Sequence, residues 1–364
     1  MNRVRGQHRI VSLDAARGFA VFAMVVAHTR GFLGEAPKPL DYAEGVLNDI
    51  AAPLFALVIG LTFTVSGPAS NAARSEKRAF LVQTGIKALL LIGIGLLLDL
   101  RPSGVNVVLA YLGVAMLLAL PLIFVGPRAL VLWAVGLTAV VPGITTLLRG
   151  LATSSPELVT PPTLLTTLLD WLVLGTGYQG MTFLPLILVG IAMGRTMLQD
   201  RRSISRLFLV SFVVFVPLEA WRVLHLPGTG IRGGYVEVLR EAPLALAAFA
   251  LIALLTDLGR DRVVRVARRV FEPFSVQGRL ALSLYVLHVC VLMLLVPLTY
   301  AAAPGMSAWF TWPRGIAIQL GLVVLCWAFA AAWWRWFGTG PVERVLRLLS
   351  RRRGSTATAT NKSA

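Results

Sequence analysis

Charged residues are scarce in this sequence. They make up 14% of its 364 residues, whereas hydrophobic residues make up 57%. Ordinary globular domains hold about 25% charged residues, so the composition excludes a water-soluble domain as the whole chain. Cysteine is scarcer still: Cys290 and Cys326 are the two in the sequence. Both fall in apolar stretches, so we expect packing residues and no disulfide framework or metal site.

Several common sequence motifs are also missing. The chain has no Walker A sequence, no His-Glu-x-x-His and no Rossmann glycine pattern, so it shows no recognisable ATP, zinc or dinucleotide site, and we expect no metal. Acidic residues number 17 against 34 Lys and Arg, which gives a net charge of +17. These basic residues alternate with apolar stretches instead of forming one patch, so we expect no nucleic-acid partner.

Long uncharged stretches separate the charged residues. A membrane-spanning helix needs about 20 apolar residues and satisfies its own backbone polar groups in lipid. Six uncharged stretches are long enough: residues 50–73, 102–127, 129–148, 171–194, 280–313 and 315–334. Four further apolar stretches contain charges, at residues 13–33, 80–100, 207–226 and 242–258. The sequence therefore predicts an all-α, polytopic transmembrane helix bundle of about ten spans.

The basic residues also predict an orientation. An even number of spans puts both termini on one side, and Lys and Arg favour the cytoplasmic side. The predicted inner segments hold about three times as many Lys and Arg as the outer ones. We therefore predict a multi-pass protein of the cell membrane with both termini cytoplasmic. Short connections indicate a single membrane-embedded domain over residues 1–350. A basic tail at residues 351–364 follows; we expect it to be disordered and to meet anionic membrane lipids.

Three segments between the spans have patterns of their own. The apolar run at residues 164–174 is short and contains Asp170, which suggests a re-entrant or interfacial helix. Residues 259–279 alternate Arg with Val and Ala, as in an amphipathic helix on the membrane surface. The outer loop at residues 227–241 contains four glycines and either frames a substrate entrance or is a plain linker.

The first span carries the first candidate site residues. An ionisable residue inside a membrane is costly and is therefore a functional candidate. Arg17 and His28 are separated by close to three helical turns, roughly 16 Å along the axis, so both lie on one stripe. Asp14 precedes Arg17 by one turn and can pair with it. In the structural alternative, Arg17 reaches for lipid headgroups and His28 bonds a neighbouring helix.

Two more candidates lie in the second and third spans. Asp49 begins the predicted second span at about the depth of His28, because the first two spans form an antiparallel hairpin. A carboxylate beside an imidazole orients it and suits acid–base work; the alternative is that Asp49 caps the start of its helix. Lys87 suits an anionic ligand such as a phosphate, or it extends to a headgroup. His225 and His288 are weaker candidates, since isolated histidines more often join helices.

Several segments together resemble one family. Residues 9–28 (RIVSLDAARGFAVFAMVVAH) are similar to the first helix of the transmembrane acyltransferase superfamily, most closely the bacterial relatives of heparan-α-glucosaminide N-acetyltransferase. Residues 48–60 (NDIAAPLFALVIG) resemble that family's second helix. The spacing from Arg17 to His28 also resembles the arginine–ten residues–histidine pattern of acyltransferase-3 proteins. Further similarities lie at residues 109–114, 177–178, 190–195, 278–285 and 340–347.

The resemblance implies transfer of an acyl group, acetyl in the named family, from cytoplasmic acyl-CoA to a sugar or another envelope acceptor. The heparan-modifying enzymes carry an active histidine in the first outer loop. Residues 29–47 contain no histidine here, which leaves His28 as the only nearby imidazole. We therefore predict His28 as the catalytic base, Asp49 as its orienting partner, and Arg17 with Lys87 near the phosphates of CoA.

A rival class of function uses the same residues. In a non-enzymatic transporter or lipid-binding protein of similar span count, His28 and Asp49 would form a proton relay or a ligand site. The sequence does not name the acyl group or the acceptor, and it leaves the oligomeric state open.

Overall fold

The computed structural model describes residues 10–69, 71–100, 104–155, 163–175, 177–302 and 311–350. Within these ranges every regular element is a helix. The predicted tail at residues 351–364 lies outside the described residues. The helices are α1 (Val11–Thr29), η1 (Arg30–Phe32), α2 (Lys38–Ser66), α3 (Arg74–Asp99), α4 (Leu109–Ala119), η2 (Leu120–Leu122), α5 (Pro127–Ser154), α6 (Leu164–Leu169), the π-helix η4 (Asp170–Leu174), α7 (Gly180–Thr196), α8 (Arg201–Val223), α9 (Tyr235–Thr256), α10 (Asp261–Val270), α11 (Glu272–Arg279), α12 (Ala281–Ala302), α13 (Trp312–Phe337) and α14 (Pro341–Ser350).

Seven helices in the described part of the chain are long and apolar enough to cross a membrane: α1 with η1, α2, α3, α5, α8, α9 and α13. The bent pair α11 and α12 makes an eighth candidate if it counts as one span. The protein is therefore a multi-pass, all-helical membrane protein, as predicted. α4 and α7 are apolar but shorter than these candidates. By length and composition alone, the described helices therefore give at most eight spans, two fewer than the predicted ten.

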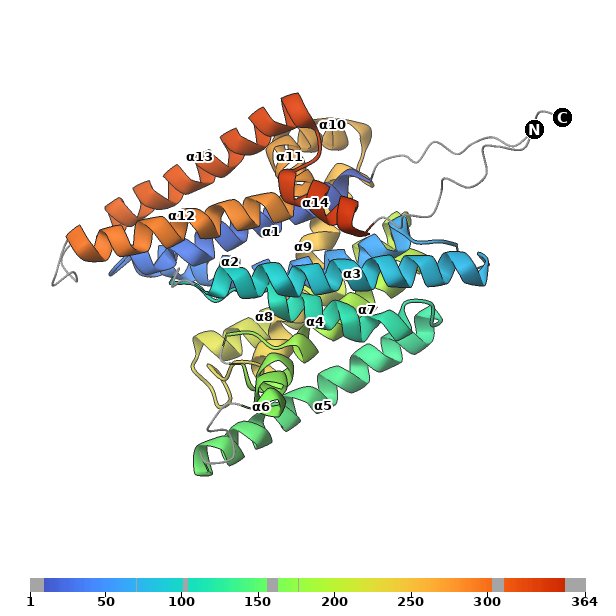
Figure 1. Cartoon of the computed structure of the whole chain (residues 1–364), viewed down its shortest axis with the longest axis horizontal. Helices are drawn as coiled ribbons and strands as arrows, with labels where there is room; N and C mark the ends of the chain where they lie inside the picture. The colour runs from blue at the N-terminus through green and yellow to red at the C-terminus, as the bar shows by residue number, and fades with distance from the viewer. Residues whose placement is uncertain are drawn as a thin grey trace.

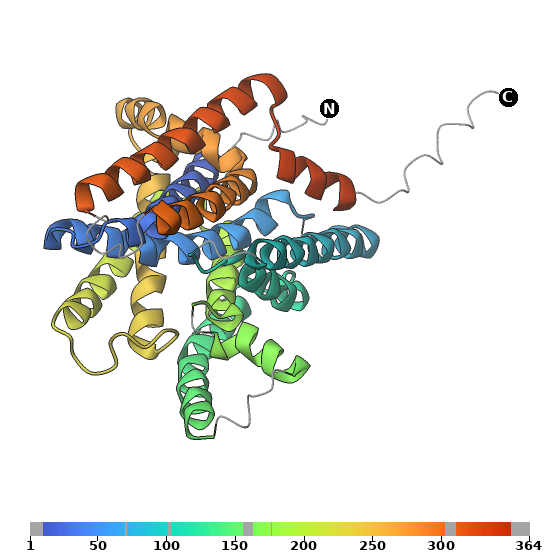
Figure 2. The same ribbon diagram turned by 60° about the vertical axis from the view of Figure 1, so that its left-hand side comes forward.

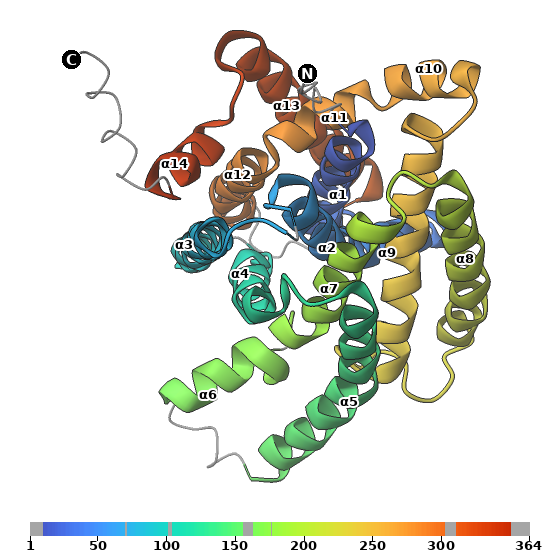
Figure 3. The same cartoon turned by 90° about the vertical axis from the view of Figure 1, so that its right-hand side faces the viewer.

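The outer helices face lipid. Leu132 on α5 is 72% exposed and Leu209 on α8 is 61% exposed, which suits a hydrocarbon surrounding and not water. Figure 1 shows α1, α2, α3, α12 and α13 running side by side along the long axis, with α14 lying across them near α3. Turned views show α8 and α9 paired on the opposite side (Figure 3), while α6 and α5, which packs against α7, lie at the edge of the bundle farthest from α13 (Figures 2 and 3).

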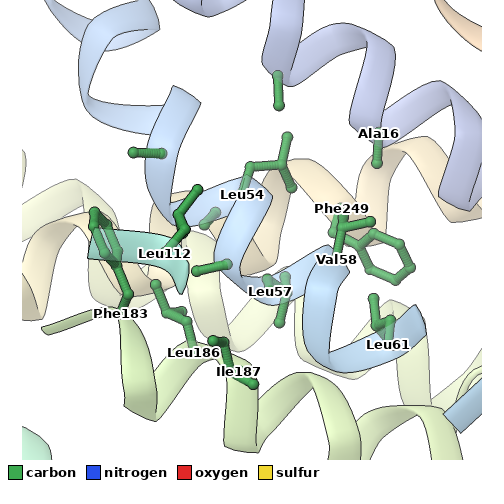
Figure 4. Close-up of a cluster of buried hydrophobic side chains, with 14 of the residues drawn as sticks. Ala16, Leu54, Leu57, Val58, Leu61, Leu112, Phe183, Leu186, Ile187 and Phe249 are labelled. Carbon is green, nitrogen blue, oxygen red and sulfur yellow. The ribbon is translucent and has the colours of Figure 1, made fainter. Parts of the chain in front are cut away.

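The centre of the bundle is the crossing of α2 and α7. Leu57 and Ile187 are fully buried there, and Phe249 of α9 packs against the same cluster (Figure 4). Gly60 and Gly190 face each other across the crossing: a Cβ at Gly60 would overlap the carbonyl oxygen of Ile187. The two backbones touch because both positions lack a side chain, as at other small-residue contacts in membranes.

A second close contact joins α1 to α11. A Cβ at Gly18 would overlap the backbone carbonyl of Phe274, and one at Gly278 would overlap the carbonyl oxygen of Asp14. The start of α1 is held by Asp257 at the end of α9, whose carboxylate accepts from the backbone N–H of Ser12 at 2.9 Å. These contacts fix the position of the charged end of α1.

Three predicted boundaries differ from the structure. α2 begins at Lys38 and not near residue 48, because its first turns extend beyond the uncharged stretch. Residues 171–174 complete the short helix formed by α6 and η4, and the next span begins at Gly180. The predicted surface helix at residues 259–279 is two helices. Of these, α10 lies on the surface of the bundle. α11 buries Gln277 and Gly278 against α1, and an 87° bend then leads into α12.

Candidate functional site

A cavity of about 550 Å³ lies between α1, α2, α3, α4, α12 and α14. Its wall is apolar over most of its length and charged where α1, α3, α11 and α14 contribute. The apolar lining includes Met24, Phe55, Val58, Leu91, Leu112 and Met116, and the polar lining is Asp14, Arg17, Lys87, Arg279, Tyr285, Thr339 and Glu343, with Trp334 beside them. A volume of this size suits a cofactor-sized ligand.

Two guanidinium groups share one carboxylate in this cavity. Nη1 of Arg17 lies 3.3 Å from Oδ1 of Asp14, and Nε of Arg279 lies 3.7 Å from Oδ2 of the same residue. Arg17 also donates a hydrogen bond to the hydroxyl of Thr62. The guanidinium of Arg279 stacks over the ring of Trp334, 4.4 Å from its centroid. The cluster therefore carries one positive charge more than Asp14 neutralises.

Lys87 adds another positive charge from the opposite wall. It lies at the middle of α3, its side chain is exposed, and it lines the cavity together with Arg17. The structure thus brings the two predicted CoA-binding residues to one cavity. Their role remains a prediction.

Glu343 gives a structural role to residues 340–347, one of the segments that resemble the family. Its Oε1 accepts from the backbone N–H groups of Leu282 at 2.8 Å and Ser283 at 3.1 Å, which are free donors at the start of a helix. A third hydrogen bond to the carboxylate comes from the hydroxyl of Ser283. The carboxylate therefore caps α12 and holds α14 against the cavity.

His28 lies one turn beyond Met24, which lines the cavity from the same stripe of α1. Its Nδ1 is 2.9 Å from Nε2 of His288 on α12, and the two rings lie within 25° of parallel with centroids 5.1 Å apart. Tyr285, a lining residue, stands edge-on to both rings, at 6.3 Å from His28 and 5.0 Å from His288. The sequence-based conclusion that His28 is the only nearby imidazole is therefore wrong, because His288 lies beside it.

Asp49 has other partners. Its carboxylate pairs with Arg240 of α9, and Arg240 also binds Glu219 of α8 at 2.9 Å. Among the hydrogen bonds and ion pairs of the described residues, none joins Asp49 to His28. The structure therefore does not bring the predicted base and its predicted partner together. The alternative that Asp49 caps its helix is wrong, because α2 begins at Lys38.

A polar cavity of about 660 Å³ surrounds this ion-pair network. It lies between α2, the end of α8, the start of α9 and the loop between α8 and α9, and its lining includes Arg30, Lys38, Tyr42, Asp49, Arg222, His225, Arg232, Glu237 and Arg240. His225 has a φ of 53°, directly after the end of α8. The glycine-containing loop between α8 and α9 thus borders a charged cavity, in line with the first of its two interpretations.

Three residues of these sites were not among the sequence candidates: Arg240, Arg279 and Glu343. Arg279 and Glu343 lie in segments that carried the family resemblance, so a signal for them existed. Arg240 gave no local signal, because its partner Asp49 is 191 residues away. His288 was a weaker candidate, and its pairing with His28 across 260 residues left no local pattern.

The helices define a multi-pass membrane protein with a cavity between them. Residues 9–218, more than half of the chain, match the family model of the heparan-alpha-glucosaminide N-acetyltransferase catalytic domain, and the chain belongs to that family. Residues 192–353 match a second family model, described as a protein of unknown function (DUF418). A comparison with curated proteins finds no significant match. The first matched region contains His28 and Lys87, and the second contains Arg279 and His288.

The ion-pair network gives the first prediction. Arg240 is 3% exposed and bridges two carboxylates, whereas Arg222 is 32% exposed and pairs with Glu219 alone. Arg240→Met leaves the buried carboxylate of Glu219 and the half-buried carboxylate of Asp49 short of a partner, a loss that typically costs about 3–5 kcal/mol when the pair is buried. We expect a clearly lower melting temperature in detergent for Arg240→Met than for the control Arg222→Met, and partial recovery when Asp49→Asn is added. Equal melting temperatures for the two single variants would contradict this role.

Proposed function

We propose that the protein is an acyltransferase that moves an acyl group, acetyl by family, from cytoplasmic acyl-CoA to a sugar or another acceptor of the cell envelope. The observation that carries the proposal is a single cavity. Arg17, Lys87 and Arg279 line it, and so does Tyr285, whose ring contacts the His28–His288 pair. The cationic groups proposed for phosphates therefore line this cavity, and the imidazole proposed for proton transfer contacts one of its lining residues, Tyr285.

The residues present fit an acyl-CoA. Arginine and lysine bind phosphate oxygens through charge-assisted hydrogen bonds, and here they border an otherwise apolar cavity that suits a pantetheine arm. Arg17 and His28 lie roughly 16 Å apart along α1, and Met24 lines the wall between them. The phosphates then stay at the charged wall while the thioester lies toward His28.

The proposed reaction needs one base. Acyl-CoA supplies an activated thioester, so the protein mainly has to orient the acceptor and remove its proton. His28 takes the proton from the acceptor hydroxyl or amine as its oxygen or nitrogen bonds to the acyl carbon. The carbon–sulfur bond then breaks, and the imidazolium returns the proton to the leaving thiolate. No acyl–enzyme bond is required.

We also propose ten membrane crossings with both termini in the cytoplasm. Each of the ten predicted stretches contains a helix, and α4 and α7 would be the two short spans. Figure 1 supports an even number of crossings: the start of α1, the helices α10 and α11, and α14 lie at one end of the bundle. These segments hold many of the basic residues that favour the inner side.

The orientation predicts a labelling pattern. Arg265 on α10 and Gly230 in the loop after α8 are both exposed. In a background lacking Cys290 and Cys326, a membrane-impermeant maleimide added to intact cells should label Gly230→Cys and should miss Arg265→Cys until the cells are opened. The reverse pattern would overturn the proposed orientation.

The donor site predicts a binding defect. Replacing Lys87 by Met removes a charge that contacts phosphate in our proposal, so the affinity for coenzyme A should fall about tenfold or more. Lys77→Met is the matched control: Lys77 lies on the same helix, stacks over Phe124 and does not line the cavity. Isothermal titration of both variants in detergent tests this. If both variants bind coenzyme A like the wild type, Lys87 is no phosphate ligand.

The base predicts a turnover defect. General acid–base groups contribute about 10²–10⁴-fold to rate, so His28→Ala should lower turnover by that order and leave coenzyme A affinity nearly unchanged. Release of free CoA thiol from acetyl-CoA, with a glucosaminide acceptor, measures turnover. Wild-type turnover in His28→Ala would show that the acceptor is activated elsewhere. Lost stability with intact turnover per folded molecule would assign His28 to packing alone.

A further inference from the structure

Two contacts fix where the protons lie in the His28–His288 pair. Nδ1 of His288 is 3.0 Å from the carbonyl oxygen of Leu284, one turn earlier on α12. Nε2 of His288 is 2.9 Å from Nδ1 of His28. A carbonyl oxygen accepts hydrogen bonds and donates none, so Nδ1 of His288 is the atom that carries a proton.

The direction of the hydrogen bond between His28 and His288 then follows. A neutral imidazole carries a single N–H, so Nε2 of His288 is an acceptor and the shared proton belongs to Nδ1 of His28. The opposite direction would put protons on both nitrogens of His288. That residue is 0% exposed, and no ion pair of the described residues reaches it, so a cation there would be costly.

Tyr285 holds this arrangement in place. Its hydroxyl accepts from the backbone N–H of Val108 on α4 at 3.1 Å, and the residue is 1% exposed. Its ring contacts both imidazoles edge-on. The rings of His28 and His288 lie within 25° of parallel, which suits a hydrogen bond between their ring nitrogens.

We propose that His288 is a positioning residue that fixes His28 in the Nδ1–H tautomer, so that Nε2 of His28 is the atom that takes the proton of the acceptor. The assignment rests on the proposed function for its catalytic meaning. It gives His288 the orienting role that the sequence suggested for Asp49. When Nε2 gains a proton, Nδ1–H of the imidazolium donates a stronger, charge-assisted hydrogen bond to His288, which stabilises the cation without a carboxylate.

The tautomer of His28 can be measured without following the acyl-transfer reaction. The chain has four histidines, so ¹⁵N-histidine labelling and single replacements of His8, His225 and His288 assign each ring by nuclear magnetic resonance. At mildly alkaline pH, the wild-type protein should show His28 protonated at Nδ1 with an unprotonated Nε2, and His288 protonated at Nδ1. A His28 ring protonated at Nε2 would overturn the proposal, whatever the activity of the protein.

Two variants at one position test the role in turnover. His288→Phe keeps an aromatic ring at this position but removes the acceptor, so nothing holds the proton on Nδ1 of His28. We expect turnover to fall about 10²–10⁴-fold with coenzyme A affinity unchanged. His288→Gln offers an amide oxygen near the former Nε2, and it should recover part of the turnover and the Nδ1–H signal of His28.

The outcomes separate this inference from the proposed function. Wild-type turnover in a folded His288→Phe protein would overturn the positioning role while leaving His28 as the base. If His288→Phe does not fold, His288→Gln with the wild-type tautomer but turnover as low as that of His28→Ala would also overturn it. Wild-type turnover in His28→Ala would overturn the catalytic base itself and would leave the tautomer assignment to stand on its spectrum.

Discussion

The contact between the backbones of α1 and α11 is the constraint on which the candidate site depends. Gly18 and Gly278 leave no side chain between the two helices, so Arg279 comes within ion-pair distance of Asp14 and next to Arg17. The 87° bend that follows turns α12 along the bundle. A larger side chain at either glycine would move the cations and α12 together, and the histidine pair would separate with them.

The bend also explains why the site has its components in this order. α12 starts at the charged wall, where Glu343 caps it, and its next turns carry Tyr285 and then His288. α1 runs beside it with Arg17, Met24 and His28 on one stripe. The order of the proposed phosphate-binding groups and the proposed base is therefore set by two neighbouring helices, α1 and α12. The rival transporter interpretation, which uses His28 and Asp49 as one relay, has each of them bound to a different partner.

Much of the fold was predictable because lipid imposes a simple rule on local sequence. Uncharged runs marked helices, and helical periodicity placed Arg17 and His28 on one stripe. Boundaries were less predictable where a helix continues into polar residues, as α2 does from Lys38, since charges beyond the hydrocarbon do not end a helix. The partners of His28 and Asp49 were not predictable: His288 and Arg240 approach them through tertiary packing across 260 and 191 residues, and no local pattern records such pairs.

We propose that one cavity leads acyl-CoA from Arg17, Lys87 and Arg279 toward His28. A cryo-electron microscopy map of the protein in lipid nanodiscs with a non-hydrolysable acetyl-CoA thioether tests it most directly. We predict density for the phosphates beside Arg17 and Lys87, and the thioether end against Tyr285 within reach of Nε2 of His28. The proposal would be contradicted if the analogue gave density in the charged cavity around Arg240 while the cavity lined by Arg17 and Lys87 held only lipid.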